Sequence, residues 1–424
     1  MSPGRVMTDA GRTGAERRPL AEWLERIGTE HPRDVLAGLE RVARVAHCAG
    51  VAPPAPRNVI VAGTNGKGST CVFLEQLLLA AGDSVGTTLS PHLARFNERV
   101  RVDGREATDA ALVEAFEAVE RARGDTPLSY FEFAILAALR LFRTRRVDTA
   151  VLEVGLGGRL DATNVVDADV AVIVSVGLDH QEYLGDTREA IAAEKAGVLR
   201  ADRPVVYGEP DVPEAVQAHA RALGAPLFAY GRDYHDAVDA RGWTVRLADG
   251  RTVHTETPPR VPACNAATAV QAWALLDPGF DPDAVEGACL RASVPGRLEH
   301  VRAEGRRWVL DTAHNPQAAR FLAAHLPSRI GCAVLGMLGD KDAPGVVGPL
   351  LPRVAHWIVT DNRVPRGLCA ADLRGRLEGM VTPRVISDPD AALTAARSTT
   401  GANDAILVCG SFDLVARARA RLNC

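Results

Sequence analysis

From residue 58 onward, short apolar runs alternate with longer amphipathic segments, and no other feature of the sequence constrains the fold as strongly. Runs rich in β-branched residues, typical of buried parallel strands, occur at 58–62, 84–89, 149–154 and 170–176. The spacing of apolar residues predicts helices over 70–81, 109–122, 130–143 and 188–199. Strands that alternate with helices in this way predict an α/β fold with a doubly wound, mostly parallel sheet of the P-loop type.

The segment that precedes this pattern predicts a leader and two helices. Residues 1–19 are polar and rich in Arg and Gly, which is typical of a loose leader. Amphipathic spacing predicts helices over 20–28 and 33–49, separated by His31 and Pro32.

The segment 226–257 has a different pattern, which indicates a β-hairpin. Two short strands, 243–247 and 252–255, flank Asp249 and Gly250, a pair that suits a type I′ turn.

The last third of the chain repeats the strand–helix alternation. After helices predicted over 265–276 and 281–292, Pro295 and Gly296 mark the expected hinge between domains. Strands are then predicted at 308–311, 330–337, 356–360, 384–386 and 405–409, and helices begin at Pro316, Ala370, Pro389 and Phe412. We therefore predict a leader at 1–19, a central domain at 20–294 and a smaller Rossmann-like α/β domain at 297–424.

Composition excludes several classes of protein. The chain has 424 residues, which favours two or three domains, and a net charge of −4, which gives no electrostatic reason to expect nucleic acid or a membrane surface as a partner. No apolar run reaches the roughly 18 residues of a membrane span. The eight cysteines are irregularly spaced without a CxxC pair, so we expect a cytoplasmic protein. We also expect a monomer.

Lysine is rare in a chain with 49 basic residues: it occurs only at Lys67, Lys195 and Lys341. Arginine differs from lysine in shape, hydration and pKa, so a compact ammonium is one explanation for lysine at these positions. Chance placement of so few residues is the alternative.

Residues 63–70, Gly-Thr-Asn-Gly-Lys-Gly-Ser-Thr, lie between a predicted strand and a predicted helix and are called the phosphate loop below. Glycines let successive N–H groups point inward, and a helix N-terminus adds positive potential, so this pattern indicates phosphate binding. Lys67 would meet the terminal phosphates, and a hydroxyl of Ser69 or Thr70 would approach magnesium. The alternative is a tight turn with a solvated lysine.

Three polar residues are predicted at strand ends, where sites in open parallel sheets lie: Ser90, Glu153 and His180. A carboxylate, a hydroxyl and a neutral imidazole supply part of a magnesium shell, and phosphate oxygens and water fill the rest. The alternatives are an ion pair between Glu153 and Arg159, and a histidine satisfied within its loop.

Lys195 is predicted on the helix that follows His180. It is either a surface lysine beside Glu194 or an amine that reacts with carbon dioxide to form a carbamate, which arginine cannot do.

Taken together, these motifs resemble the folylpolyglutamate synthases and dihydrofolate synthases of the Mur ligase superfamily. The resemblance runs in order from about residue 20 to the end of the chain. The matching motifs are Ala21-Glu-Trp-Leu-Glu-Arg, the phosphate loop, Ser90-Pro-His-Leu, Phe96-Asn-Glu-Arg-Val, Tyr130-Phe-Glu-Phe, the segment from Glu153 to Asn164, Asp179-His180, Glu194-Lys-Ala-Gly, Pro295-Gly-Arg, Asp311-Thr-Ala-His-Asn-Pro, Gly336-Met-Leu-Gly-Asp-Lys-Asp and Gly410-Ser-Phe.

The resemblance implies a role for each motif. Contacts to ATP are implied for Thr64, Asn65, Gly66, Lys67, Gly68, Ser69, Asn265, Arg297, Asp311 and His314. Ligands of magnesium, two ions in all, are implied at Ser90, Glu153, His180 and a carbamylated Lys195. Proximity to the pterin substrate is implied for Ser129, Tyr130, Phe131, Glu132, Leu160, Asp161 and Ala162. Catalytic roles are implied for Lys67, Lys195, His180 and Arg297.

The implied reaction joins L-glutamate to dihydropteroate and to folates with ATP, through an acyl phosphate. Two alternatives stay open. The first is a Mur-type ligase with another acid and amine, and the second is a protein that senses ATP without ligation.

Overall fold

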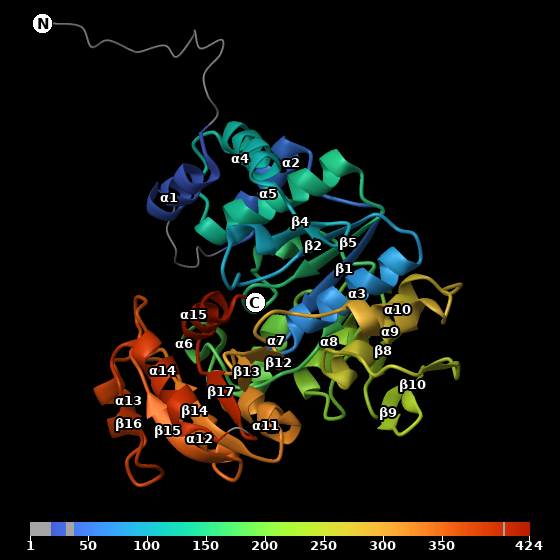
Figure 1. The fold of residues 1–424 in the computed structure, drawn as a ribbon. Coiled ribbons are helices and arrows are strands. Elements are labelled where there is room, and N and C mark those ends of the chain that lie inside the picture. Colours follow the sequence, from blue (N-terminus) through green and yellow to red (C-terminus); the bar gives the residue numbers. More distant parts are fainter. Residues whose placement is uncertain (1–17, 31–37, 402) are drawn as a thin grey trace, which may run out of the picture.

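The computed structural model describes residues 18–30, 38–401 and 403–424, and these described residues form three sheets (Figure 1). The predicted leader therefore lies outside the described residues except for Arg18 and Pro19, as does the predicted break at His31 and Pro32.

The first sheet is mostly parallel. Its strands are β1 (Arg57–Ala62), β2 (Val85–Thr88), β3 (Val100–Val102), β4 (Arg105–Glu106), β5 (Thr149–Glu153), β6 (Val170–Ile173), β7 (Val205–Tyr207) and β8 (Leu227–Ala229). Their order is β4-β3-β2-β5-β1-β6-β7-β8. The six strands from β2 to β8 in this order are parallel, and the β3–β4 hairpin adds an antiparallel edge.

Helices cover both faces of this sheet. One face packs against α1 (Leu20–Glu30), α2 (Glu40–Ala49), α4 (Asp109–Arg123), α5 (Tyr130–Arg145), α7 (Arg188–Ala196) and α8 (Glu214–Ala222). The other packs against α3 (Lys67–Ala80), α9 (Ala263–Leu276) and α10 (Ala284–Arg291). Short elements in the connections are η1 (Phe96–Arg99), η2 (Ala162–Val165) and α6 (Gln181–Leu184).

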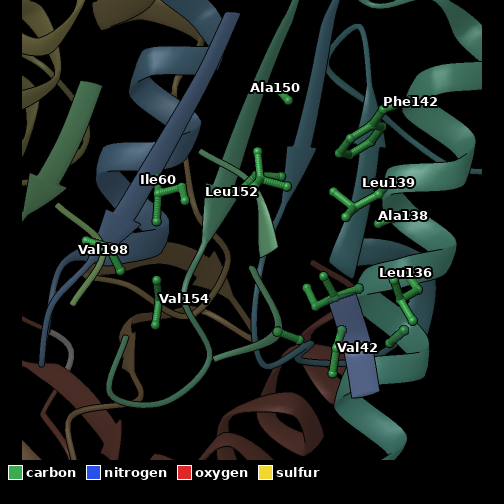
Figure 2. Close-up of a cluster of buried hydrophobic side chains, with 14 of the residues drawn as sticks. Val42, Ile60, Leu136, Ala138, Leu139, Phe142, Ala150, Leu152, Val154 and Val198 are labelled. Carbon is green, nitrogen blue, oxygen red and sulfur yellow. The ribbon is translucent and has the colours of Figure 1, made fainter. Parts of the chain in front are cut away.

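The β-branched composition of the strands follows from this two-sided burial. In β1, Ile60 faces one core while Val59 and Val61 face the other. Figure 2 shows Leu152 of the first core between Ile60 of β1 and Phe142 of α5. The ring of Phe142 lies so close to β2 that a Cβ atom at Gly86 would come within 2.5 Å of it, so the strand requires glycine at that position.

A small antiparallel sheet lies beside α9. It consists of β9 (His235–Asp239), β10 (Gly242–Arg246) and β11 (Thr252–Thr255), in the order β11-β10-β9. The hairpin of β10 and β11 was expected. Strand β9 was not, because most of its residues are exposed and lack alternation.

The third sheet forms a separate layer system. Its strands are β12 (Glu299–Ala303), β13 (Arg306–Asp311), β14 (Ile330–Leu335), β15 (Val354–Val359), β16 (Arg384–Val385) and β17 (Ala405–Cys409), in the order β12-β13-β17-β14-β15-β16. Only β12 is antiparallel to its neighbour. One face carries α11 (Pro316–His325), α12 (Ala343–Leu350) and α13 (Ala370–Arg376), and the other carries α14 (Pro389–Thr399) and α15 (Phe412–Leu422).

We call the part of the chain up to α10 the large lobe and the part from Arg297 onward the small lobe. The segment between them contains the expected hinge at Pro295 and Gly296, whose role as a domain boundary stays a prediction. The predicted α/β class with two parallel-rich sheets is confirmed. Among the described residues, no helix is long and apolar enough to cross a membrane.

Candidate active site

The phosphate loop connects β1 to α3 at the carboxyl end of the first sheet. Gly66 has a φ of 83° and directly precedes α3, a conformation that glycine adopts without strain. The loop is held against the segment that follows β6, because the N–H of Thr64 donates to the carbonyl of Ser175 (2.9 Å) and the N–H of Asn65 donates to Ser175 Oγ (2.9 Å). The N-terminus of α3, which favours anions, thus faces the space above the sheet.

Side chains of the loop divide into buried and accessible groups. Lys67 Nζ donates to the carbonyls of Gly63 (3.0 Å) and Thr64 (3.4 Å), and it has no acidic partner among the described residues. Thr70 is fully buried and donates to the carbonyl of Gly66 (3.0 Å). Of the two hydroxyls considered for magnesium, only that of Ser69 therefore reaches the cavity described below.

Glu153 ends β5 and is 4% exposed. Its Oε2 accepts from the N–H of Ser90 (2.8 Å), and the carboxylate has no ion pair among the residues that the structure describes. The alternative partner, Arg159, pairs with Glu194 instead (2.7 Å), so that interpretation was wrong. Burial raises the pKa of Glu153, although nearby Lys67 opposes the shift. Burying a carboxylate without an ion pair costs free energy, and a bound metal cation removes that cost. Glu153 therefore suits a metal ligand.

His180 and Lys195 complete this wall. His180 has a left-handed backbone, with φ of 52°, and burial lowers its pKa to about 4, so its imidazole is neutral at physiological pH. Lys195 is 3% exposed and its Nζ has no hydrogen bond or ion pair among the described residues, so it is not the surface lysine of the first interpretation. Burial, with a contribution from Lys67, lowers its pKa to about 7.

The donor set fits a divalent cation only in part. Among the described residues, no group of three or more His, Cys, Asp and Glu side chains is placed so that it could hold a metal ion by itself. The set of Ser90, Glu153 and His180 contains two such side chains and a hydroxyl. It therefore requires further oxygens from a ligand and from water to hold Mg²⁺.

Residues from both lobes face the loop. Asn265, near the start of α9, lies against Gly66. A Cβ atom added at Gly66 would come within 2.8 Å of Asn265 Nδ2. Arg297 donates to Thr312 Oγ1 and lies over the ring of Phe412, 5.0 Å from its centre. Asp311 is 9% exposed and accepts from the N–H of Leu298 (2.8 Å) and from that of Ala313 (2.8 Å), so it fixes the backbone beside Arg297.

One cavity of about 910 Å³ brings these groups together between the lobes. The predicted site residues that line it are Thr64, Asn65, Gly66, Lys67, Gly68, Ser69, Ser90, Ser129, Phe131, Glu132, Glu153, Leu160, Asp161, Ala162, His180, Lys195, Asn265, Arg297, Asp311 and His314. Tyr130 does not line it, because its ring packs edge-on against Phe96 (6.2 Å between centres). A substrate contact of Tyr130 stays a prediction.

Several residues expected near the substrate also hold the backbone. Ser129 and Glu132 form the capping box of α5: Ser129 Oγ accepts from the N–H of Glu132 (3.2 Å), and Glu132 accepts from the N–H of Ser129 (2.6 Å). Asp161 accepts from the N–H groups of Gly155, Leu156 and Thr163, each at 3.0 Å, which fixes the loop after β5. A substrate contact of these side chains stays a prediction.

The cavity wall also contains residues that sequence reasoning did not assign to the site, among them Arg99, Asp179 and Gln317. Asp179 was noted only as part of a motif, and its partner Lys341 only because lysine is rare. Asn65 Nδ2 donates to Gln317 Oε1 (2.7 Å), so the small lobe contacts the phosphate loop directly. The pair is 252 residues apart in the sequence, and no local pattern could have found it.

Comparison with known proteins identifies the family. The Mur ligase middle domain model matches residues 61–255, and the model of the Mur ligase, glutamate ligase domain matches residues 296–412. The dihydrofolate synthase/folylpolyglutamate synthase of Escherichia coli strain K12 is 42% identical over 410 residues, 96% of this chain and 96% of that protein. This chain belongs to the dihydrofolate synthase/folylpolyglutamate synthase family.

Solved structures agree with this membership. E. coli FolC in complex with DHPP and ADP has a TM-score of 0.91 at 42% identity, covering 96% of this chain and 98% of that one. The bifunctional folylpolyglutamate synthase/dihydrofolate synthase from Yersinia pestis, complexed with AMPPNP and Mn ion, has a TM-score of 0.90 at 42% identity, with the same coverage. The predicted resemblance is confirmed, and as a member of the dihydrofolate synthase/folylpolyglutamate synthase family the chain is a ligase.

Proposed function

We propose that this ligase joins L-glutamate to dihydropteroate, forming dihydrofolate, and also to folates, extending their glutamate tail at the expense of ATP. One observation carries the proposal. The phosphate loop, the buried unpaired carboxylate of Glu153 and Arg297 from the small lobe face one cavity of about 910 Å³. That volume lies in the upper part of the range for small-molecule sites, as a site for a nucleotide beside a pterin acid requires.

The nucleotide's phosphates are assigned to the phosphate loop. Residues Thr64 to Ser69 line the cavity, the N-terminus of α3 offers its N–H groups to phosphate there, and Lys67 is the cation within the loop. Asn265 borders Gly66, and Arg297 and Asp311 enter from the other side. His314 borders the same space. ATP would thus be held by both lobes.

Two magnesium ions are assigned to Ser90, Glu153, His180 and Lys195. The buried carboxylate without an ion pair and the neutral imidazole suit a divalent cation, provided that phosphate oxygens complete the shell. Bound there, the cations would neutralise charge on the phosphates during transfer.

Lys195 is assigned as a carbamate. Its amine, buried and with a pKa lowered to about 7, is largely neutral just above that pH. A neutral amine attacks carbon dioxide, a C–N bond forms and one proton leaves, and the product is a carboxylate that would serve as a metal ligand. This explains why lysine stands there in an arginine-rich sequence.

The acid substrate is assigned to the apolar side of the cavity. Phe131 and Leu160 provide apolar surface there, and Ser129, Glu132, Asp161 and Ala162 form the surrounding wall. A Cβ atom at Gly155 would meet the Phe131 ring at 2.4 Å, so the ring lies directly on the loop that follows β5. A flat pterin ring suits such a surface.

The reaction would proceed in two steps. A carboxylate oxygen of the acid attacks the γ-phosphorus of ATP, and ADP leaves, so an acyl phosphate forms. The amino group of glutamate attacks the acyl carbon, the C–O bond to phosphate breaks, and the amide forms with loss of a proton. Lys67 and Arg297 would stabilise the charge on the transferring phosphoryl group, and approach of the lobes would exclude water.

The decisive experiment incubates the purified protein with ATP, magnesium, glutamate and either dihydropteroate or tetrahydrofolate, and measures product mass. Addition of one glutamyl unit to both acids is the expected result. Addition to the folate alone would restrict the function to polyglutamylation. ATP turnover stimulated by another acid and amine would indicate a different Mur-type ligase, and turnover without any stimulation would indicate an ATP sensor.

We further propose a cytoplasmic monomer with a domain boundary at Pro295 and Gly296. All eight cysteines are free thiols, which suits a reducing compartment. Both walls of the cavity come from one chain, so the site needs no partner subunit. The change from one sheet system to the next between α10 and β12 supports the boundary.

A further inference from the structure

The function proposed above leaves one of the three lysines without a role. Lys341 lies between β14 and α12 of the small lobe, and its side chain is 6% exposed. Its Nζ lies 2.8 Å from Asp179 Oδ1 and 3.3 Å from Asp340 Oδ2. Asp179 belongs to the large lobe, on the segment between β6 and α6, and its side chain is 10% exposed. The two residues therefore form a buried ion pair between the lobes.

Asp179 also contacts the residue that follows it. The N–H of His180 donates to Asp179 Oδ1 (2.9 Å), in the left-handed conformation at φ of 52° that a residue other than glycine seldom adopts. The other carboxylate oxygen accepts from Asn315 Nδ2 (2.9 Å) and lies 3.6 Å from His314 Nε2. Asp179 therefore links the two lobes. Small-lobe side chains contact its carboxylate, and the carboxylate in turn accepts from the backbone N–H of His180.

The same small-lobe turn reaches the phosphate loop. Asn315 and Asn65 exchange hydrogen bonds through their amides (3.1 and 3.2 Å), and Gln317 Nε2 donates to Glu209 Oε1 (2.7 Å) on the large lobe. These contacts involve neutral amides on at least one side. Lys341 with Asp179 is the fully charged pair in this buried network.

We propose that Asp179 and Lys341 are positioning residues: their ion pair joins the lobes and fixes His180 in the geometry that the nucleotide site requires. This inference rests on the proposed function, because it assumes that the cavity between the lobes binds ATP. The site is nearly closed to solvent and presents two carboxylates, those of Asp179 and Asp340, to one Nζ. A compact ammonium contacts both carboxylates from one point, at 2.8 and 3.3 Å.

The test compares Lys341→Met with wild type by steady-state kinetics and by small-angle X-ray scattering. Without Lys341 the buried carboxylate of Asp179 has lost its charged partner, which favours separated lobes in which Asp179 is in water. Part of the binding free energy of ATP is then used to bring the lobes together. We expect the KM for ATP to rise about 30-fold, the lower end for truncating a buried charge pair, while kcat falls less. We also expect the ligand-free variant to have a larger radius of gyration. Wild-type values of both KM and radius would overturn the proposal.

Glu182→Gln is the matched control. Glu182 pairs across the lobes with Arg366 at 3.9 Å, but these side chains are 56% and 63% exposed, and such pairs contribute little. We expect unchanged KM and radius of gyration. A loss equal to that of Lys341→Met would mean that any interlobe charge acts alike, which contradicts a specific role for Lys341.

A double-mutant cycle with Asp179→Asn separates the pair from unrelated effects. Each single variant breaks the same ion pair, so we expect the double variant to be impaired about as much as the worse single one. If the fold-increases in KM of the two single variants multiply in the double variant, the proposed coupling between Asp179 and Lys341 is overturned. Should Lys341→Met fail to fold, Lys341→Gln carries the same expectation. If wild type itself does not ligate, the proposed function fails, while the scattering comparison still tests the interlobe pair.

Discussion

At the scale of single residues, burial without pairing defines the chemistry of this site. Lys195 and His180 are shifted toward their neutral forms, with pKa values lowered to about 7 and about 4, and the pKa of Glu153 is raised. In each case burial is the largest cause. A neutral amine and a neutral imidazole are reactive toward carbon dioxide and metal ions, so the cost of burying these groups has a functional explanation.

The amine of Lys195 gives a prediction with a definite pH dependence. The protonated amine does not react, so carbamate should increase as pH rises through about 7, the pKa of Lys195. His180 stays neutral across this range and does not contribute to the dependence. Carbon NMR of the protein in isotopically labelled bicarbonate should show one carbamate signal that is stronger at pH 8 than at pH 6, values about one unit on each side of that pKa. The signal should be absent from Lys195→Arg, and an equal signal in that variant would assign it to another amine.

The phosphate contacts proposed for Lys67 and Arg297 give a second prediction. Lys67→Ala and Arg297→Ala should each lower kcat by about 100-fold or more, since each removes charge stabilisation that is strongest during phosphoryl transfer. The measurement is phosphate release that requires both acid and glutamate. Arg203→Ala is the control, because Arg203 is 56% exposed and pairs only with Asp169 at the surface (3.4 Å). Undiminished ligation by either site variant would reject its role.

At the scale of elements, helix caps connect local sequence to the cavity. Ser129 caps α5 at the cavity wall, and Thr108 caps α4 away from it, accepting from the N–H of Ala111 (3.3 Å). Replacing either with alanine should lower the free energy of unfolding by about 1 kcal/mol. Only Ser129→Ala should also raise the KM for dihydropteroate, because it releases the first turn that carries Phe131. Thermal unfolding and kinetics of both variants check this, and equal KM values would show that the cap does not shape the substrate wall.

The phosphate loop gives a prediction of its own. Gly66→Ala places a Cβ atom 2.8 Å from Asn265 and Val174 at a φ of 83°, so both the contact and the backbone oppose it. We expect the KM for ATP to rise by about 10-fold or more, equivalent to about 1.4 kcal/mol of lost binding. Gly375→Ala in α13 is the matched control, with no atom within 4 Å and no left-handed φ, and it should behave as wild type. Equal behaviour of the two variants would remove the loop from the binding site.

Elements with a continuous apolar pattern were predictable from the sequence, and elements with an interrupted pattern were not. The strands with two buried faces were predicted within one to three residues of their ends, because their apolar runs are continuous. Helix α12 was missed because Gly345, Gly348 and Pro349 weaken its helical pattern, although Asp342 caps it by accepting from the N–H of Gly345 (2.9 Å). Phe131 lines the cavity and Tyr130 packs on Phe96 instead, because residues adjacent on a helix point in different directions.

The site was predicted to the same extent and for a related reason. Groups at strand ends and in the loop follow from the parallel sheet, so Lys67, Glu153 and His180 were expected together. The pair of Asp179 and Lys341 spans 162 residues and two sheets. Its formation depends on how the lobes are placed relative to each other, and no periodicity or motif encodes that placement.

At the scale of the whole molecule, the two lobes have separate hydrophobic cores. The clusters around the first sheet and those around the third do not share buried residues among the described ones, although Leu93 of the large lobe packs at the edge of the small-lobe core. The remaining interlobe contacts named above are polar and surround the cavity. The relative placement of the lobes should therefore depend on what the cavity contains.

This arrangement predicts how ligand changes unfolding. Without nucleotide, calorimetry should resolve two unfolding transitions, one for each lobe, because few apolar contacts couple the two lobes. AMPPNP with Mg²⁺ binds across both lobes, so at 100 times its Kd it should stabilise the protein by about 2.7 kcal/mol and bring the transitions together. Arg297→Ala removes the contact from the small-lobe side, and it should reduce this merging while leaving the ligand-free transitions in place. Two transitions that remain separate in saturated wild type would mean that the nucleotide engages one lobe alone, since a ligand held by both must couple their unfolding.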